Sequence, residues 1–254
     1  KRQSDACYNA RTMNGRSPTT TDNAPKRGVH RAVRSYVLRA GRVTEGQRRA
    51  LEELWPGFGV EAGGEALDFS ALFGNENPVI MEIGFGNGEA TWQMAQAHPD
   101  ENFLGVEVHK PGVGRLLLKI EEHGLENIRI ACDDAVEVLQ HRVKDASLDG
   151  VRIYFPDPWP KKRHHKRRIV QKPFVALLAR KMRPGGILHL ATDWEPYAEF
   201  MLEVIQQSDE FENVSSTGGH CPKPEWRPLT KYESRGERLG HKVTDLLFRR
   251  KAAG

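Results

Sequence analysis

The sequence predicts an α/β fold: a doubly wound, mainly parallel sheet of about seven strands with an antiparallel C-terminal strand. Three observations predict it. Short apolar runs rich in β-branched residues alternate with segments of helical periodicity over most of the 254 residues. One run leads into a loop with glycine at alternate positions and then into a helical pattern. Acidic residues directly follow successive runs, at the edge where a doubly wound sheet binds its ligands.

The expected strands and helices alternate along the chain. Strands are expected at 79–83, 103–108, 128–132, 151–155 and 187–191, followed by β-like runs around 211–217 and 242–249. Helices are expected at 45–55, from residue 90 onward, and at 113–123, 135–142, 169–182 and 195–207. Pro56-Gly57, Gly124 and Pro184-Gly185-Gly186 are expected to end the helices before them. Strands joined through helices lie parallel, so the arrangement is Rossmann-like and forms one domain.

Charge is spread unevenly along the chain. The net charge is +4, but residues 1–50 carry 12 Lys and Arg against 3 Asp and Glu, a net +9, and the remainder carries −5. Residues 1–28 are rich in Ser, Thr, Asn, Pro and Arg without periodicity, which predicts disorder. We therefore expect a flexible basic arm over 1–42 and one folded domain over 43–254. Such an arm suits a polyanionic partner, or it is only a solvated tail.

Composition argues against several classes of protein. The three cysteines are odd in number and lack C-x-x-C spacing, which is typical of free thiols in a reducing compartment. The ten histidines form no metal-binding pattern, so we expect no metal. No apolar run approaches the roughly 18 residues of a membrane helix, and no signal-like apolar core begins the chain. We expect a cytoplasmic protein without a membrane partner, with Met13 as its natural start.

The glycine loop follows the first buried strand and reads Glu82-x-Gly84-x-Gly86-x-Gly88. A dinucleotide fingerprint would place its last glycine where this chain has Glu89. Such a loop, at the start of a helix, presents backbone N–H groups to a ligand that approaches closely. A carboxylate beside the loop suits a cationic or zwitterionic ligand such as S-adenosylmethionine better than it suits a pyrophosphate. The alternative is a turn that only reverses the chain.

Acidic residues recur at the ends of the expected strands, namely Glu82, Glu107, Asp134, Asp157 and Asp193. The second of them stands where a carboxylate accepts hydrogen bonds from ribose hydroxyls. The third stands beside Asp133, where an acid or its neighbouring backbone reads an adenine amino group. One such acid is more often a helix cap. Five in succession, together with the glycine loop, favour a ligand site.

The loop after the fourth expected strand combines an acid, an aromatic ring and a run of cations. Pro156, Pro158 and Pro160 stiffen the backbone around Asp157 and Trp159. All eight residues from 161 to 168 are Lys, Arg or His. A charge run is usually a solvated face, but this position favours the approach of a nucleic-acid backbone. The tryptophan either stacks on an extruded base or anchors the loop, and the sequence leaves both open.

The motifs in these segments resemble those of the bacterial tRNA (guanine-N7)-methyltransferases, over about residues 30 to 250. They are Glu-Ile-Gly-Phe-Gly-Asn-Gly (82–88), Phe-Leu-Gly-Val-Glu-Val-His (103–109), Phe-Pro-Asp-Pro-Trp-Pro-Lys-Lys-Arg-His-His-Lys-Arg-Arg (155–168), Ala-Thr-Asp-Trp-Glu-Pro-Tyr (191–197) and Thr-Lys-Tyr-Glu-Ser-Arg-Gly (230–236). The Pro-Asp-Pro-Trp and Thr-Lys-Tyr-Glu segments are far more discriminating than the glycine loop. The resemblance implies transfer of a methyl group from S-adenosyl-L-methionine to N7 of a guanosine in the tRNA variable loop.

The resemblance also implies roles for particular residues. The implied methyl-donor site consists of Glu82, Gly84, Gly86, Gly88, Glu107, Asp134 and Asp157. Asp157 is in addition the implied catalytic residue. The implied substrate positions are Lys161, Asp193, Thr230, Lys231, Tyr232 and Glu233, and the implied tRNA contacts are Arg163, His164, His165, Lys166, Arg167 and Arg168. Members of this family occur as monomers and as homodimers, so the oligomeric state does not follow.

Guanine N7 carries an in-plane lone pair, so methylation there requires no general base and depends chiefly on in-line positioning. We expect Asp157, with Asp193 or Glu233, to accept hydrogen bonds from the guanine N1–H and amino group. Three other functions remain to be separated from this one. They are a methyltransferase acting on ribosomal RNA or a small molecule, a non-catalytic RNA-binding module, and a nicotinamide-dependent dehydrogenase, which would require Gly at position 89.

Overall fold

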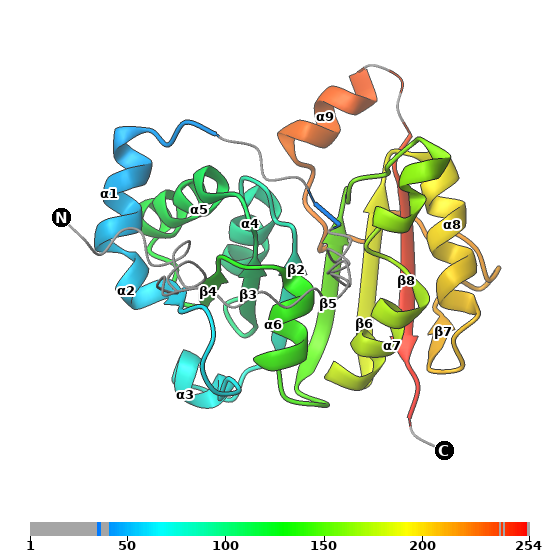
Figure 1. The fold of residues 1–254 in the computed structure, drawn as a ribbon, viewed down its shortest axis with the longest axis horizontal. Coiled ribbons are helices and arrows are strands. Elements are labelled where there is room, and N and C mark those ends of the chain that lie inside the picture. The colour runs from blue at the N-terminus through cyan, green and yellow to red at the C-terminus, as the bar shows by residue number, and fades with distance from the viewer. Residues whose placement is uncertain (1–34, 37–40, 239, 241, 253–254) are drawn as a thin grey trace, which may run out of the picture.

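The computed structural model describes residues 35–36, 41–238, 240 and 242–252, so nearly all of the predicted arm over 1–42 lies outside the described residues. Within the described part, eight strands form one sheet in the order β1-β4-β3-β2-β5-β6-β8-β7 (Figure 1). The strands are β1 (Gly59–Val60), β2 (Val79–Ile83), β3 (Asn102–Val106), β4 (Ile128–Ala131), β5 (Leu148–Tyr154), β6 (Met182–Thr192), β7 (Phe211–Asn213) and β8 (Thr244–Arg250).

The helices lie between the strands, as the alternating pattern predicts. They are α1 (Glu45–Glu53), α2 (Trp55–Phe58), α3 (Phe69–Phe73), α4 (Glu89–Ala97), α5 (Lys110–His123), α6 (Ala135–His141), the 3₁₀ helix η1 (Lys162–Arg167), α7 (Lys172–Lys181), α8 (Glu195–Gln206) and α9 (Lys231–Arg238). Among the described residues, no helix is both long and apolar enough to cross a bilayer.

The strand order gives the sheet a point at which its winding reverses. From β2 the chain moves outward to β3 and β4, and it then returns to place β5 on the other side of β2. All pairs from β1 to β6 are parallel, whereas β8 is antiparallel to both β6 and β7. In doubly wound sheets ligands bind at the carboxyl ends of the strands beside such a reversal. The predicted doubly wound α/β fold is confirmed, and its ligand edge lies above β2 and β5.

Each face of the sheet is covered by its own set of helices. Ala50 of α1, Met94 of α4 and Leu116 of α5 pack on one face. Side chains of α3, α6, α7 and α8 pack on the other, with Leu139 and Tyr197 fully buried among them. All five residues of β2 are buried, because helices cover both of its faces. The central strand therefore fixes the start of the glycine loop rigidly.

Several boundaries differ from the predicted ones. Pro56 does not end the first helix: α1 ends at Glu53, and Pro56 lies in the first turn of α2, where a missing N–H costs nothing. The segment Pro184-Gly185-Gly186 lies within the bounds of β6, beside an irregularity in its pairing with β5. The strand β1 has only two residues, too few for any pattern to predict. The polar helix α9 was also not predicted, because it carries no apolar stripe.

Candidate active site

A cavity of about 440 Å³ lies at the carboxyl ends of β2, β3, β4 and β5. Its lining includes five residues predicted for the donor site, Gly84, Gly86, Glu107, Asp134 and Asp157. The fold therefore brings together residues that are up to 73 positions apart in the sequence. Ser35 and Tyr36 line the same cavity.

The glycine loop adopts a backbone that requires glycine. Gly84, Gly86 and Gly88 have φ angles of 74°, 59° and 73°, in the left-handed region that side chains disfavour. Gly112, in the first turn of α5, comes so close to the loop that a Cβ there would lie 2.0 Å from the carbonyl oxygen of Gly86. Glycine is thus needed both within the loop and in the helix beneath it.

Glu107 fastens this loop to the end of β3. One carboxylate oxygen accepts a hydrogen bond from the N–H of Gly86 at 2.8 Å. The other accepts from the N–H groups of Val108 and His109 at 2.7 and 2.9 Å. Three backbone donors hold the carboxylate in one orientation at the cavity wall. A fixed carboxylate with remaining acceptor capacity is what ribose hydroxyls require.

Asp134 stands at the beginning of α6 and caps it. Its carboxylate accepts a hydrogen bond from the N–H of Val136 at 2.9 Å, as a helix N-cap does. The carboxylate of Asp133 accepts from the N–H of Asp134 at 2.7 Å. Both residues line the cavity. Asp134 thus caps a helix and lines the cavity at the same time.

Glu82 is held differently from the other acids. It is only 3% exposed, and its carboxylate accepts a hydrogen bond from the hydroxyl of Thr91 at 2.7 Å. Burial raises the pKa of Glu82 to about 7, against the opposing effects of the Thr91 hydrogen bond and the charge of Arg152. The structure thus places Glu82 behind the glycine loop, where an additional cation would favour its charged form.

This burial predicts how the stability of the free protein changes with pH. Between pH 4.5 and about 7 the unfolded chain loses the Glu82 proton while the folded protein keeps it, so stability falls as pH rises through this window. Glutamine does not titrate, so the free energy of unfolding of Glu82→Gln should not fall over this pH range. The difference in unfolding free energy, variant minus wild type, should therefore increase by about 3 kcal/mol from pH 5 to 8, since one pKa unit corresponds to about 1.36 kcal/mol. Urea unfolding of both proteins at several pH values measures the difference, and a constant difference would contradict it.

The loop after β5 holds Asp157 in a strained backbone. Phe155 and Trp159, on either side, have φ angles of 50° and 46°, which cost residues with side chains on the order of 1–3 kcal/mol each. The Asp157 side chain is exposed, and none of the described residues forms a hydrogen bond or ion pair with it. Strain at this loop together with a carboxylate left open is typical of a functional position.

Some side chains of the cationic segment 161–168 are exposed to solvent, whereas others are in contact with the rest of the protein. Lys161, Lys162, Arg163 and Lys166 are exposed. The guanidinium of Arg167 lies 3.8 Å from the ring centre of Trp159, whose indole N–H donates to the carbonyl of Ser35 at 3.2 Å. One face of this ring is therefore covered, which favours the loop-anchor role of the tryptophan.

Arg168 lies apart from the open cations. It is 4% exposed, donates to the carbonyl oxygen of Pro158 at 2.9 Å and packs over the rings of Tyr197 and Phe200 of α8. Burial lowers the pKa of Arg168, although Tyr197 opposes this effect. The resemblance implied a tRNA contact at Arg168; in the structure its side chain is buried and holds the loop to α8.

The predicted substrate residues at the start of α9 contact residues at the beginning of α4 and just after β5 and β6. The hydroxyl of Tyr232 donates to Asp193 at 3.3 Å, and its ring contacts that of Phe155 at 5.0 Å. The N–H of Lys231 donates to the carboxylate of Glu89 at 2.9 Å, and the hydroxyl of Thr230 accepts from the N–H of Glu233 at 3.2 Å. The tyrosine is 59% exposed beside the cavity loop.

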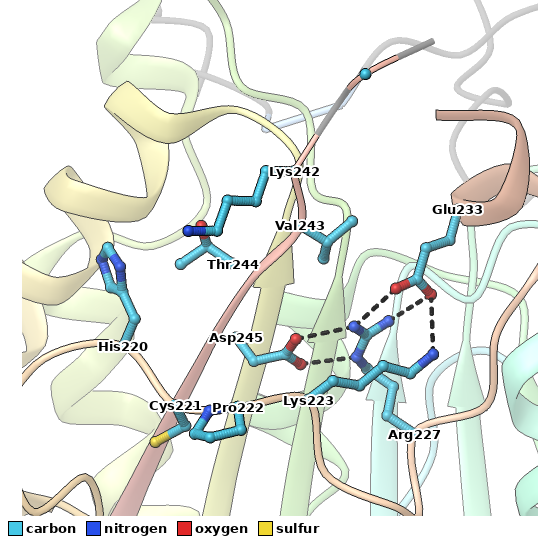
Figure 2. Close-up of a pocket in the computed structure, with 11 residues that line it drawn as sticks. His220, Cys221, Pro222, Lys223, Arg227, Glu233, Lys242, Val243, Thr244 and Asp245 are labelled. Carbon is cyan, nitrogen blue, oxygen red and sulfur yellow. Dashed lines mark hydrogen bonds and ion pairs between the residues drawn. The ribbon is translucent and has the colours of Figure 1, made fainter. Parts of the chain in front are cut away.

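Glu233 has a different environment from its neighbours. Its carboxylate is buried and paired with Arg227 (Figure 2). The sequence did not indicate Arg227, its second partner Asp245, or His189, which is bonded to Asp245. A histidine within the apolar run 187–191 was the one available signal. Among the described residues, no group of three or more His, Cys, Asp or Glu is placed to hold a metal.

Comparison with known proteins places this chain in a family. A family model described as a putative methyltransferase matches residues 76–246. The tRNA (guanine-N(7)-)-methyltransferase of Alcanivorax borkumensis is 55% identical over 232 residues, which cover 91% of this chain and 97% of that protein. The enzyme of the same name from Pseudomonas aeruginosa is 56% identical over 87% of this chain and 90% of that protein.

Solved structures of lower identity share the architecture. The 16S rRNA methyltransferase KamB superposes with a TM-score of 0.54 at 16% identity, covering 74% of this chain and 96% of that one. That likeness concerns the fold alone. The family itself rests on the close relatives and on the matched model over 76–246, which contains the glycine loop and the Pro-Asp-Pro-Trp loop. The chain belongs to the tRNA (guanine-N7)-methyltransferase family.

Proposed function

We propose that this protein transfers a methyl group from S-adenosyl-L-methionine to N7 of a guanosine in the variable loop of tRNA. One observation carries the proposal: Asp157, whose carboxylate is exposed, lines the cavity and is followed four residues later by the exposed cations that begin at Lys161. The loop after β5 thus joins a wall of the proposed donor site, an acceptor for the base and a segment for the phosphates. The close relatives named for this activity support the choice of base and of RNA.

The residues that line the cavity suit the methyl donor in charge and in hydrogen-bonding capacity. When bound, S-adenosylmethionine supplies an electrophilic methyl group on a sulfonium. Glu107 would hold the ribose hydroxyls, because its carboxylate is already fixed by three backbone donors. Asp134 and the backbone beside it would bind the adenine, and the glycine loop provides the close approach. The buried carboxylate of Glu82 lies nearby as a counter-charge for a cationic ligand.

The substrate side requires residues that orient a guanine ring. Guanine presents an N1–H and an amino group as hydrogen-bond donors, so it requires carboxylate acceptors, and Asp157 and Asp193 provide them. Methylation at N7 makes the base cationic, which nearby carboxylates favour electrostatically. Adenine lacks the N1–H, so the same acceptors would discriminate against it. Lys161 and the segment Thr230–Glu233 complete the proposed substrate region.

The cationic segment would bind the tRNA backbone. Lys162, Arg163 and Lys166 are exposed there, and cations that neutralise phosphates make affinity dependent on salt. The histidines His164 and His165 and the Arg167 guanidinium lie in the same segment. Desolvation, together with the charges of Arg163 and Arg167, lowers the pKa of His164.

We propose that the protein is located in the cytoplasm and acts as a monomer or homodimer. We also propose that the arm over 1–42 is a further tRNA contact and that it precedes a methyltransferase domain over 43–254.

A direct assay tests this function. Incubating the protein with labelled methyl donor and a tRNA transcript should label the tRNA, and borohydride–aniline treatment should then cleave it at one guanosine in the variable loop. An unmethylated transcript provides the control for cleavage. Label in ribosomal RNA but not in tRNA, or label at a site resistant to aniline, would contradict the proposal.

A further inference from the structure

The helix α9 carries the proposed substrate residues, yet it projects from the body of the protein (Figure 1). Its exposed side holds Tyr232, and its first turn is fixed to the body by side-chain contacts with Glu89, Asp193 and Arg227. The first two contacts lie at the surface, where single hydrogen bonds contribute little. The contact with Arg227 is the buried one.

Arg227 forms a two-sided clamp. Two of its nitrogens donate to the two carboxylate oxygens of Glu233 at 2.7 and 2.9 Å. Its remaining donors bind the two oxygens of Asp245, on β8, at 2.7 and 2.8 Å. All three side chains are at most 2% exposed. Figure 2 shows the guanidinium between the two carboxylates, with Lys223 beside Glu233 at the rim of a second cavity.

The clamp continues to the methyl-donor cavity. The carboxylate of Asp245 accepts a hydrogen bond from Nε2 of His189 at 2.7 Å, and Nδ1 of that histidine lies 3.0 Å from the hydroxyl of Tyr154. Tyr154 lines the donor cavity. A continuous chain of buried hydrogen bonds therefore runs from the cavity wall, across β5, β6 and β8, to the first turn of α9.

The charged groups in this series of buried hydrogen bonds stabilise one another's charged forms. Burial opposes the charge of Arg227, but its hydrogen bonds to Glu233 and Asp245 outweigh that effect and raise its pKa. Burial also opposes the charge of Asp245, but hydrogen bonds from His189 and Arg227 lower its pKa. Paired, bidentate contacts of this kind fix geometry more than they add stability, because desolvation offsets most of the attraction.

We propose that Arg227 is a positioning residue for the methyl transfer: it holds α9, through Glu233, so that Tyr232 and Asp193 meet at the mouth of the donor cavity. This inference rests on the proposed function. Arg227 does not itself line the donor cavity; its guanidinium lies 6.0 Å from the ring centres of Tyr154 and Phe155, which do. Glu233 then serves as the anchor of its segment, and the guanine contacts fall to Asp157, Asp193 and Tyr232.

A double-mutant cycle separates this role from direct substrate contact. Glu233→Gln and Arg227→Met should each lower kcat/KM for tRNA by about 10- to 100-fold, the range that small misplacements produce. The double variant should lose about as much as the worse single one, because both break the same clamp. Donor affinity by calorimetry should stay within about twofold of wild type. Arg249→Met is the matched control, because Arg249 lies at the other end of β8 from Asp245 and the substitution breaks only an exposed ion pair with Glu212.

A second readout does not depend on activity. When α9 is released from its anchor, trypsin should cleave it faster at Lys231 and Arg235. The fold of Glu233→Gln should remain, because the hydrogen bonds between Arg227 and Asp245 persist in that variant. Wild-type activity in a folded Arg227→Met protein would overturn the inference, and so would losses that multiply in the double variant or unchanged tryptic cleavage in Glu233→Gln. If wild type itself fails to methylate tRNA, the proposed function falls, while the cleavage experiment still tests the anchor.

Discussion

Asp157→Ala should lower kcat/KM for tRNA by about 10²–10³-fold, the cost of removing one charge-stabilising group from an active site. The carboxylate is exposed, and none of the described residues is bonded to it, so its removal leaves the fold intact. Its proposed contribution is to the guanine, which becomes cationic during methyl transfer. The loss should therefore exceed any change in donor affinity. Steady-state methylation of a tRNA transcript, with donor affinity from calorimetry, measures both quantities.

The control for this variant is another exposed aspartate distant from the cavity. Asp209 lies between α8 and β7, and Asp209→Ala should leave both parameters unchanged. Turnover of Asp157→Ala near that of wild type would remove Asp157 from the mechanism. An equal loss in donor affinity would instead make it a donor contact only.

The fold was predictable because its signals are local. Each central strand is a short apolar run, and each is followed by a helical pattern, as in β2 and α4. Gly124 ends α5 in the left-handed conformation that the sequence predicts. The positions of the acids at strand ends followed from the same pattern. What the pattern does not give is side-chain direction: Glu107 and Asp134 line the cavity, whereas Glu82 turns to Thr91 behind the loop.

The clamp on α9 could not be predicted for a related reason. Its members, His189, Arg227, Glu233 and Asp245, come from one helix, two strands and a loop, and only Glu233 belongs to a motif singled out in the sequence, there as a substrate residue. Only the pairing of β6 with β8 brings His189 and Asp245 together. A charge run is equally ambiguous, because burial of Arg168 and exposure of Lys166 depend on the packing of α8. Such distinctions require the tertiary structure.

Gly112→Ala should weaken binding of the methyl donor by about 10- to 100-fold. A Cβ at this position would lie 2.0 Å from the carbonyl oxygen of Gly86, so α5 and the glycine loop must move apart. Overpacking of this kind costs about 1–3 kcal/mol, and the loop, being at the surface, gives way before the buried helix. Because Glu107 is bonded to the N–H of Gly86, a shift of the loop also displaces that carboxylate. Calorimetric titration of S-adenosylmethionine measures the loss.

Gly46→Ala in α1 is the matched control, because the added Cβ would meet nothing closer than Leu118 at 3.9 Å. That variant should bind the donor as wild type does and be at least as stable, since Ala has the higher helix propensity. Wild-type affinity in Gly112→Ala would mean that the loop can accept the displacement, and the close approach of α5 would then not be what sets the donor site. Weaker binding with unchanged far-ultraviolet circular dichroism would locate the effect in the loop rather than in the fold.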